Sequence, residues 1–307
     1  MENAQSLPAI GFVGTGLMGA PMARRLAAHG YSVRAWNRTY TKAAALQEYG
    51  VGAVSTPEQL VSDQGWQAQV LITMLDAGPV VLEIVHRLLP YLRPGMVLID
   101  MSSTKQSEAV EIAAMLRNAG VQMLDCPVSG GVIGAEQGTL ALMAGGDAEV
   151  FTRMESLLSV FGRPVRVGGH GSGQLAKLCN QLIVGGTIEI VAEALLLAQA
   201  GGADPAAVRA ALRGGFAESR ILEVHGQRML NRSFLPGGKV RTQHKDMQNI
   251  LAAAEDAGVA LPVTEMVSDI FAKLLQHQPD ADHSAAILEL EQQNPAHRLG
   301  DGPTVLP

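Results

Sequence analysis

Three polar side chains share one face of an otherwise apolar segment that begins near residue 171. They are Lys177, Asn180 and Gln181. In a helix, which turns about 100° per residue, Asn180 lies about 60° to one side of Lys177 and Gln181 about 40° to the other. The surrounding residues are mostly leucine, isoleucine and valine, and burial among them disfavours a charged ammonium group. The lysine therefore either extends its amine to water or transfers protons, and proton transfer near neutral pH favours a lowered lysine pKa.

A glycine-rich turn near the N-terminus has the pattern that binds a dinucleotide. The residues G-T-G-L-M-G follow a short apolar run and precede a helical pattern. Gly14 permits the tight bend, Gly16 lets the backbone approach a pyrophosphate, and Gly19 allows the helix to pack closely on the strand. The motif alone is weak, but a second strand at residues 31–36 completes a βαβ unit. We therefore predict a dinucleotide site rather than a merely structural turn.

The residues after that second strand favour NADP over NAD. Asn37, Arg38 and Thr39 stand where an acidic residue would bind the adenosine ribose hydroxyls of NAD. A carboxylate would repel a 2′-phosphate, whereas an arginine pairs with it and a hydroxyl bonds to it. The alternative is that Asn37 and Thr39 only form a turn or a helix cap, and NAD stays open as a second cofactor.

Strands and helices alternate over the first half of the chain, and only helical patterns follow. The alternation predicts an α/β fold with a doubly wound sheet, whose ligand crevice lies at the carboxyl ends of the strands. Among the expected elements are a helix over residues 42–49, one strand over residues 121–128 and a helix over residues 244–257. The expected domains are a Rossmann-type domain at 1–168, a long interdomain helix at 169–200, an all-α substrate and dimerisation domain at 201–294 and a flexible tail at 295–307.

Two loops fall at the carboxyl edge of this sheet. Ser129-Gly130-Gly131 offers a hydroxyl and backbone N–H groups free of side-chain obstruction, which suits a carboxylate. Ser103 belongs to a second loop that faces the same crevice. Taken singly, such segments are more often plain loops, but their shared position favours a functional reading.

Composition and charge describe an ordinary globular protein. The chain has 307 residues, of which 47% are hydrophobic and 17% charged, enough for about two domains. The formal net charge is -6 and lysine and arginine form no block. This excludes the basic surface of a nucleic-acid or membrane binder, so small molecules and further copies of the chain are the expected partners.

The cysteines, the histidines and the N-terminus bear on compartment and metal content. Cys126 and Cys179 lie far apart in apolar segments, which favours reduced core thiols over a disulfide. The N-terminal segment lacks the pattern of a signal peptide, and no uninterrupted apolar run reaches the roughly 18 residues that span a bilayer. We therefore expect a cytoplasmic protein. His225, His244 and His283 lack the spacing of metal ligands, so we expect no metal site.

Four motifs together resemble the β-hydroxyacid dehydrogenase family. They read G-F-V-G-T-G-L-M-G-A-P-M-A, D-C-P-V-S-G-G, G-T-L-A-L-M-A-G-G and G-S-G-Q-L-A-K-L-C-N-Q, and they follow the family's order over nearly the whole chain. The resemblance implies an oxidoreductase that interconverts a small β-hydroxyacid and its semialdehyde or keto acid, with Lys177 as the acid/base. It also implies that Ser129, Gly130 and Gly131 bind the substrate carboxylate. The cofactor contacts expected from the motifs and the resemblance are Gly14, Gly16, Leu17, Met18, Gly19, Asn37, Arg38, Thr39, Met74, Leu75, Ser103 and Lys245.

The second half carries further expectations. Lys245 and Asp246 read by themselves as a solvated turn that opens a helix, but the resemblance implies that they close over the active site. We expect Asn180 to take part in catalysis by orienting the lysine or the substrate hydroxyl, and Gln181, Lys245 and Asp246 to bind the substrate. The pair Asn180-Gln181 is similar to tartronate semialdehyde reductases, whereas many hydroxyisobutyrate enzymes have two asparagines. Reductases of the family often carry an aromatic residue where this chain has Gly238. The substrate's size and shape therefore stay open.

Two other functions remain as alternatives. Imine reductases look similar in the cofactor half down to Asn-Arg-Thr, but they generally lack a lysine at position 177. A dinucleotide-binding module without catalysis is the other alternative, and Lys177 with the intact serine-glycine-glycine loop disfavours it. The weakly charged helical half also suggests self-association as a homodimer or homotetramer.

Overall fold

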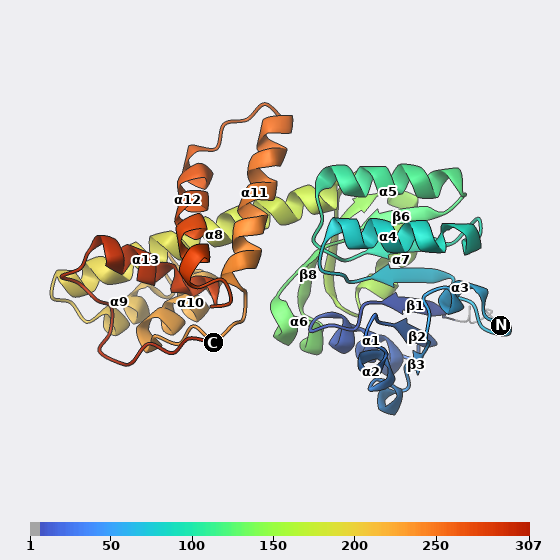
Figure 1. Cartoon of the computed structure of the whole chain (residues 1–307), viewed down its shortest axis with the longest axis horizontal. Coiled ribbons are helices and arrows are strands. Elements are labelled where there is room, and N and C mark those ends of the chain that lie inside the picture. The colour runs from blue at the N-terminus through green and yellow to red at the C-terminus, as the bar shows by residue number, and fades with distance from the viewer. Residues whose placement is uncertain (1–6) are drawn as a thin grey trace. The chain divides into compact units, whose positions relative to one another are not determined.

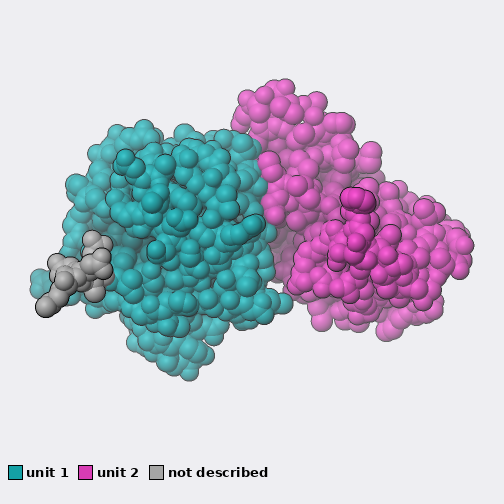
Figure 2. Space-filling model, turned by 180° about the vertical axis from the view of Figure 1, so that it is seen from behind, with its two compact units in different colours: residues 1–177 teal, residues 178–307 magenta. Residues whose placement is uncertain are grey.

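Short apolar runs in the first half of the chain form the centre of a sheet (Figure 1). The computed structural model describes residues 7–307. The chain divides into two units, unit 1 up to residue 177 and unit 2 over residues 178–307 (Figure 2). Residues 1–6, which belong to the N-terminal segment read above as lacking a signal peptide, lie outside the described residues. Each unit is described by itself.

Unit 1 contains a single mixed sheet, with nine strands over the described residues, in the order β3-β2-β1-β4-β5-β6-β8-β7 and with β9 paired to β8. The six strands from β3 to β6 are parallel. Strand β8 runs antiparallel to β6 and β7 and parallel to β9. The strands are β1 (Ile10–Val13), β2 (Val33–Trp36), β3 (Gly52–Ala53), β4 (Val70–Thr73), β5 (Val97–Asp100), β6 (Gln122–Asp125), β7 (Val128–Ser129), β8 (Leu140–Gly146) and β9 (Gly162–Gly168).

Helices cover both faces of this sheet, because its central strands alternate apolar side chains to two separate cores. Ile10 and Phe12 of β1 belong to the core under α1 and α7, whereas Val13 belongs to the core under α4 and α5. The predicted doubly wound Rossmann-type fold is thereby confirmed. The helices of unit 1 are α1 (Gly19–Ala28), α2 (Tyr40–Ala44), α3 (Gln59–Ser62), α4 (Gly78–Leu88), α5 (Gln106–Asn118), α6 (Gly131–Gln137) and α7 (Ala148–Leu158), with 3₁₀ turns η1 (Gln47–Tyr49) and η2 (Leu89–Tyr91).

Two elements of unit 1 differ from their predicted form. The helix expected over residues 42–49 is the short α2 followed by η1, which ends at Tyr49 and is followed by Gly50 with a positive φ of 79°. The strand expected over residues 121–128 is divided into β6 and β7. Pro127 separates the two strands, and its missing N–H cannot join a continuous ladder.

Unit 2 is helical and packs around the long helix α8 (Ser172–Ala200), which begins in unit 1. Asp204 caps the next helix by accepting from the N–H of Ala206, as its position before Pro205 predicts. Ile188, Val191 and Leu195 of α8 lie in the core of this unit. The other helices are α9 (Pro205–Leu212), α10 (Arg220–Asn231), α11 (Val240–Asp256), α12 (Pro262–His277), η3 (His283–Ala285) and α13 (Ala286–Gln293).

Helix α8 is long and apolar enough to cross a membrane by length and composition alone. The core helix of a globular domain passes the same test, and the burial of one side of α8 within unit 2 agrees with that reading. Its other side is exposed, and Cys179 lies there. The expectation of two core thiols is therefore wrong for Cys179 and right for Cys126, which is buried.

The last residues of the chain pack on unit 2, contrary to the expectation of a loose tail at 295–307. Leu299 is fully buried, and Val305 exchanges backbone hydrogen bonds with Arg232 and Phe234. The buried guanidinium of Arg232 also binds Thr304, the carbonyl of Leu299 and the carboxylate of Glu291. Contacts of this kind leave no periodicity in the sequence, so the absence of periodicity is not a sign of disorder here.

Glu189 is a buried acid on the packed side of α8. Its side chain is 7% exposed, and its Oε1 has no hydrogen-bond partner among the described residues. Burial, with smaller contributions from Glu193 and Glu289, raises the pKa of Glu189 to about 8. Because the folded-state pKa lies above the unfolded value, the folded protein binds this proton more tightly, and its stability falls as pH rises from about 4.5 to about 8.

We predict that Glu189→Gln removes this pH dependence. The free energy of unfolding of the wild type should lose up to about 1.4 kcal/mol per pH unit relative to the variant over that interval. Urea unfolding between pH 5 and pH 9 measures the difference. Glu111→Gln, at an exposed position on α5 that does not contribute to the pKa of Glu189, is the matched control. Parallel stability curves for the wild type and Glu189→Gln would contradict the assignment.

Candidate active site

The glycine turn between β1 and α1 has the geometry that its three glycines predict. A Cβ on Gly14 would lie 2.3 Å from the carbonyl oxygen of Met74, and one on Gly19 would lie 1.9 Å from the carbonyl oxygen of Gly14. These two glycines are therefore required by packing. A Cβ on Gly16 would meet nothing within 4 Å, and Leu17 beside it is 82% exposed. The turn thus leaves open backbone just before the N-terminus of α1, where an anion is favoured.

Asn37 supports this turn. Its Oδ1 accepts a hydrogen bond of 3.0 Å from the backbone N–H of Thr15, and its Nδ2 donates to the carbonyl of Thr39. Arg38 and Thr39 are exposed, and the Thr39 hydroxyl makes no cap bond to α2. The turn reading therefore holds for Asn37, and the cap reading does not hold for the side chain of Thr39.

The neighbouring strand ends present the other predicted cofactor residues of unit 1. Met74 follows β4 and donates its N–H to the carbonyl of Val13, and Leu75 donates its N–H to the hydroxyl of Ser102. Ser102 is buried, while Ser103 after it is half-buried. The structure thus brings the loops that carry Gly14, Leu75 and Ser103 to one edge of the sheet, because β1, β4 and β5 are adjacent and parallel.

The serine-glycine-glycine loop lies between β7 and α6. Gly130 has a φ of 138° and Gly131 a φ of 64°, conformations that favour glycine. A Cβ on Gly131 would meet nothing within 4 Å, and both glycines are exposed. Their N–H groups are therefore free of side-chain obstruction, which is the property expected of a carboxylate cradle.

Asp125 joins the end of β6 to the first turn of α8. Its Oδ1 accepts a hydrogen bond of 2.8 Å from the N–H of Gly171, and its Oδ2 accepts one of 3.0 Å from the N–H of Gln174. A carboxylate at a helix N-terminus satisfies N–H groups that the helix leaves without partners. Gly173 is required beside it, since a Cβ there would lie 2.2 Å from the carbonyl oxygen of Asp125.

Gln174 extends this connection to the serine loop. Its side chain is fully buried, donates to the carbonyl of Ser102 at 2.8 Å and accepts from the N–H of Thr104 at 3.0 Å. Lys177 follows one helical turn later and is half-buried. Sequence reasoning did not find the roles of Asp125 and Gln174. The available signals were an acid at the end of an apolar strand and a glutamine in the first turn of an apolar helix.

Asp100 and Asp125 face each other in the register of β5 and β6. Complete burial raises the pKa of Asp100 to about 6, against hydrogen bonds from Thr73 and Ser102 that lower it. Burial also raises the pKa of Asp125, against the two N–H groups at the start of α8. Two buried acids therefore lie beneath the strand ends, and each keeps its place through hydrogen bonds to loops of the candidate site.

In unit 2, the structure brings together four predicted site residues, the catalytic candidate Asn180 and the substrate-binding candidates Gln181, Lys245 and Asp246. Asn180 Nδ2 lies 2.8 Å from Gln181 Oε1, and Gln181 Nε2 lies 2.8 Å from Asp246 Oδ2. Lys245 Nζ is 3.5 Å from Asp246 Oδ1. Asp246 is buried and lies in the second turn of α11, which begins at Val240. The alternative reading of Lys245 and Asp246 as a solvated turn that opens a helix is therefore wrong, because α11 starts earlier and Asp246 is buried within it.

A second polar cluster of unit 2 contains His225, Asp282 and His283. The spacing of these residues in the sequence did not predict that they meet. Burial by itself would raise the pKa of Asp282, but hydrogen bonds and nearby positive charge hold this pKa well below its usual range. Burial lowers the pKa of His283 to about 4. The Asp282 carboxylate accepts from the N–H groups of Gly237 and Gly238 and from Ser284, with Arg228 at 3.3 Å. Its charge is therefore already balanced by the protein, and the absence of a metal site stays a prediction.

Gly238 owes its identity to this cluster. A Cβ at this position would lie 2.9 Å from Cε1 of His283. The imidazole ring therefore occupies the space into which a side chain at position 238 would begin. A larger side chain at position 238, such as the aromatic residue that reductases of the family often carry there, would therefore require His283 to move.

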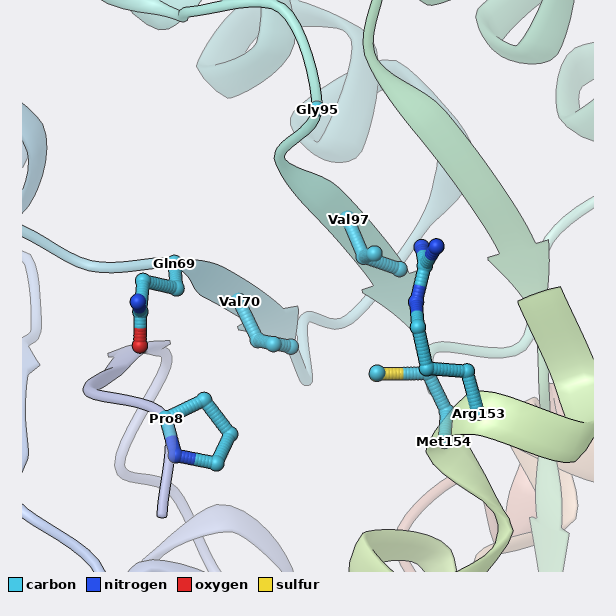
Figure 3. A pocket seen from close by; sticks show the side chains of 7 residues that line it. All are labelled: Pro8, Gln69, Val70, Gly95, Val97, Arg153 and Met154. Carbon is cyan, nitrogen blue, oxygen red and sulfur yellow. The ribbon is translucent and has the colours of Figure 1, made fainter. Parts of the chain in front are cut away.

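A cavity of about 340 Å³ lies at the other edge of the sheet (Figure 3). Val70 and Val97, the first residues of β4 and β5, line it, as does Arg153. Ligands of parallel α/β sheets bind at the carboxyl ends of the strands. The cavity is therefore separate from the candidate site.

Comparison with known proteins identifies the family. Residues 9–171 match the NAD binding domain of 6-phosphogluconate dehydrogenase, and residues 171–290 match a domain described as NAD-binding of NADP-dependent 3-hydroxyisobutyrate dehydrogenase. The 2-hydroxy-3-oxopropionate reductase of Escherichia coli (strain K12) is 39% identical over 287 residues, which are 92% of this chain and 97% of that protein. The chain belongs to the β-hydroxyacid dehydrogenase family.

Solved structures agree with this membership. The 3-hydroxyisobutyrate dehydrogenase of Mycobacterium tuberculosis, solved with L-serine, has a TM-score of 0.84 at 30% identity and covers 92% of this chain and 99% of its own. An imine reductase from Pseudomonas sp. has a TM-score of 0.60 at 18% identity over 92% of this chain and 99% of its own, which shows a shared fold only. The predicted class, an NAD(P)-dependent oxidoreductase of the β-hydroxyacid dehydrogenase family, is thereby confirmed.

For this family member, we predict that Asp125→Asn weakens the start of α8. The amide replaces one acceptor oxygen by a donor, so one of the two N–H groups loses its partner, at a cost of about 1–3 kcal/mol. The free energy of unfolding, measured in urea, should fall by that amount, and catalytic turnover should fall with it. Asp147→Asn is the matched control, since Asp147 is exposed and makes no side-chain bond to the helix that it precedes. Unchanged stability in Asp125→Asn would contradict the proposed link.

Proposed function

We propose that the protein is an NADP-preferring reductase similar to a tartronate semialdehyde reductase. Its proposed substrate is a semialdehyde or keto acid, which it reduces to the corresponding small β-hydroxyacid. The observation that supports this most is the bond between Asp125 and the first turn of α8. Asp125 ends β6, and the chain reaches the loop at Ser129 four residues later. The helix that carries Lys177 is therefore bonded to the segment that carries the carboxylate loop. The name of the E. coli relative, 2-hydroxy-3-oxopropionate reductase, supports a small hydroxy-oxo acid as the substrate.

In the proposed reaction, bound NADPH supplies a hydride to the carbonyl carbon of the substrate. The ammonium of Lys177 gives a proton to the oxygen that becomes an alkoxide, so the carbonyl is reduced to an alcohol. In the reverse direction the neutral amine of Lys177 takes the hydroxyl proton. Asn180 orients the lysine or the substrate hydroxyl, as an amide with both a donor and an acceptor can.

The remaining residues hold the substrate. Ser129 and the N–H groups of Gly130 and Gly131 bind its carboxylate, and Lys245 adds a positive charge. Fixing the carboxylate fixes the distance from the reacting carbon to the lysine, which is the contribution expected of binding groups in a hydride-transfer enzyme. Gln181 and Asp246 complete the proposed substrate contacts.

The cofactor preference rests on Arg38 and Thr39, which are exposed after β2, together with Asn37, which supports the glycine turn. A guanidinium at this position pairs with the 2′-phosphate of NADP, and the described end of β2 lacks the acidic residue that would repel it. NAD remains the alternative cofactor.

Self-association is also part of the proposal. Ile183, Ile190 and Leu197 of α8 are 63%, 62% and 74% exposed, and the spacing of seven residues places them on one stripe of the helix. The exposure of such an apolar stripe to water is energetically unfavourable, and its burial against another surface would be favourable. We propose that a second copy of the chain covers it.

Replacing Lys177 by alanine tests the proposed chemistry. We predict that Lys177→Ala lowers turnover with NADPH and tartronate semialdehyde by about three decades, because the alkoxide loses its proton donor while the cofactor contacts remain. NADPH affinity, measured by fluorescence titration, should stay nearly unchanged. Lys273→Ala, at an exposed position in unit 2, is the control. Turnover within tenfold of the wild type would overturn the assignment.

The same assay separates the alternative functions. A panel of glyoxylate, tartronate semialdehyde, succinic semialdehyde and a cyclic imine should show turnover with the hydroxy-oxo acid and not with the imine. Turnover of the imine alone would favour an imine reductase. Tight NADPH binding without turnover of any panel member would favour a dinucleotide-binding module.

Replacing Arg38 by alanine tests the cofactor preference. We predict that the wild type has the higher kcat/KM with NADPH and that Arg38→Ala lowers the NADPH-to-NADH ratio about 10- to 100-fold, the loss of one charge-assisted hydrogen bond. Arg117→Ala removes an exposed arginine from the end of α5 and should leave the ratio unchanged. A preference of the wild type for NADH would contradict the proposed pairing of Arg38 with the 2′-phosphate of NADP.

A further inference from the structure

The hydrogen bonds among Asn180, Gln181 and Asp246 have a fixed direction. An ionised carboxylate only accepts hydrogen bonds, so the Gln181 atom that lies 2.8 Å from Asp246 Oδ2 is the amide nitrogen. The oxygen of the same amide then faces Asn180, and the atom of Asn180 that lies 2.8 Å from it is again the nitrogen. Each amide therefore donates toward Asp246, and the carboxylate determines which way both amides are turned.

Both ends of Gln181 are held in place. Its backbone carbonyl accepts a hydrogen bond of 3.2 Å from Nε2 of Gln243, whose side chain is 1% exposed. Oε1 of Gln243 lies 3.3 Å from Nδ1 of the buried His283. Lys245 Nζ, at 3.5 Å from Asp246 Oδ1, gives the carboxylate a cationic neighbour. The row of amides therefore starts from a charged group that is buried, paired and carried by a packed helix.

We propose that Asp246 is a positioning residue that acts through Gln181 on the amide of Asn180. With its nitrogen turned to Gln181, Asn180 offers its carbonyl oxygen to the donors of the reaction. These donors are the ammonium of Lys177, one helical turn earlier on α8, and the hydroxyl of the hydroxyacid. This role rests on the proposed function, in which Lys177 is the proton donor.

The orientation matters because the reacting groups are themselves donors. An ammonium has three N–H donors and no acceptor, so an asparagine turned the other way would set its amino group against it. A carbonyl oxygen in the same place accepts from the ammonium and from the substrate hydroxyl. Glutamine at position 181 supplies the length that joins Asn180 to Asp246, and this gives a physical role to the Asn-Gln pair that distinguishes this chain from relatives with two asparagines.

A double-mutant cycle of near-isosteric substitutions tests the proposal. Asp246→Asn removes the acceptor-only end, so the amides lose their direction. Gln181→Glu sets a second carboxylate against Asp246. In the double variant Gln181→Glu/Asp246→Asn, the new amide at position 246 donates to the new carboxylate at position 181, whose second oxygen still accepts from Asn180. The net charge equals that of the wild type, and the direction of the Asn180 amide is restored.

We expect each single variant to lower kcat with NADPH and tartronate semialdehyde by about 10- to 100-fold, the cost of one wrongly paired buried group. The double variant should return to within about fivefold of the wild type. NADPH affinity should be the same in all four proteins. Gln248→Glu, on the same helix but bonded to Ser268, is the matched control and should leave kcat unchanged.

A double variant no faster than the slower single variant would overturn the proposal. Urea unfolding of the same four proteins provides a readout that does not need activity, because the midpoint should fall in both single variants and recover in the double variant. Recovery of stability without recovery of kcat would support the hydrogen bonds from Asn180 through Gln181 to Asp246. It would overturn the proposal that these bonds position Asn180 for catalysis. Absence of carbonyl reduction by the wild type would instead remove the proposed function, and the positioning role with it, whatever the unfolding midpoints show.

Discussion

The carboxylate of Asp125 holds the first turn of α8 against the end of β6, and the candidate site of unit 1 depends on this bond. A buried carboxylate is costly unless it is fully hydrogen-bonded, and here both oxygens accept from N–H groups of Gly171 and Gln174. The bond satisfies the acid and the helix terminus together. Lys177 consequently lies in the second turn of a helix whose N-terminus is hydrogen-bonded to the sheet.

Buried polar groups determine the other parts of the site in the same way. Gln174 ties the start of α8 to the loop of Ser102, and Ser102 in turn holds the N–H of Leu75. In unit 2, Asp246 gives direction to a row of amides that ends at Asn180. Each of these groups has its partners inside the protein, so the backbone turns and amides next to the residues proposed to react are held by hydrogen bonds.

Local chemistry made much of this predictable from the sequence. The roles of Gly14 and Gly19 follow from the sterics of a tight turn, and the shared face of Lys177, Asn180 and Gln181 follows from helical periodicity. The roles of Asp125 and Gln174 were not predictable, because their partners lie 46 to 72 residues away in sequence and no local pattern marks them. The packing of the C-terminal residues on Arg232 was missed for the same reason, and so was the meeting of His225 with Asp282 and His283.

Chemical rescue tests the central claim, that Lys177 gives the proton to the reduced substrate, most directly. Small primary amines would be added to Lys177→Ala while NADPH oxidation with tartronate semialdehyde is followed. If Lys177 is the proton donor, turnover should rise in proportion to the concentration of the ammonium form and depend on the amine's pKa, with no effect on the wild type. NADPH oxidation by Lys177→Ala at the wild-type rate without added amine would contradict it, and so would a variant that binds NADPH normally yet responds to no amine.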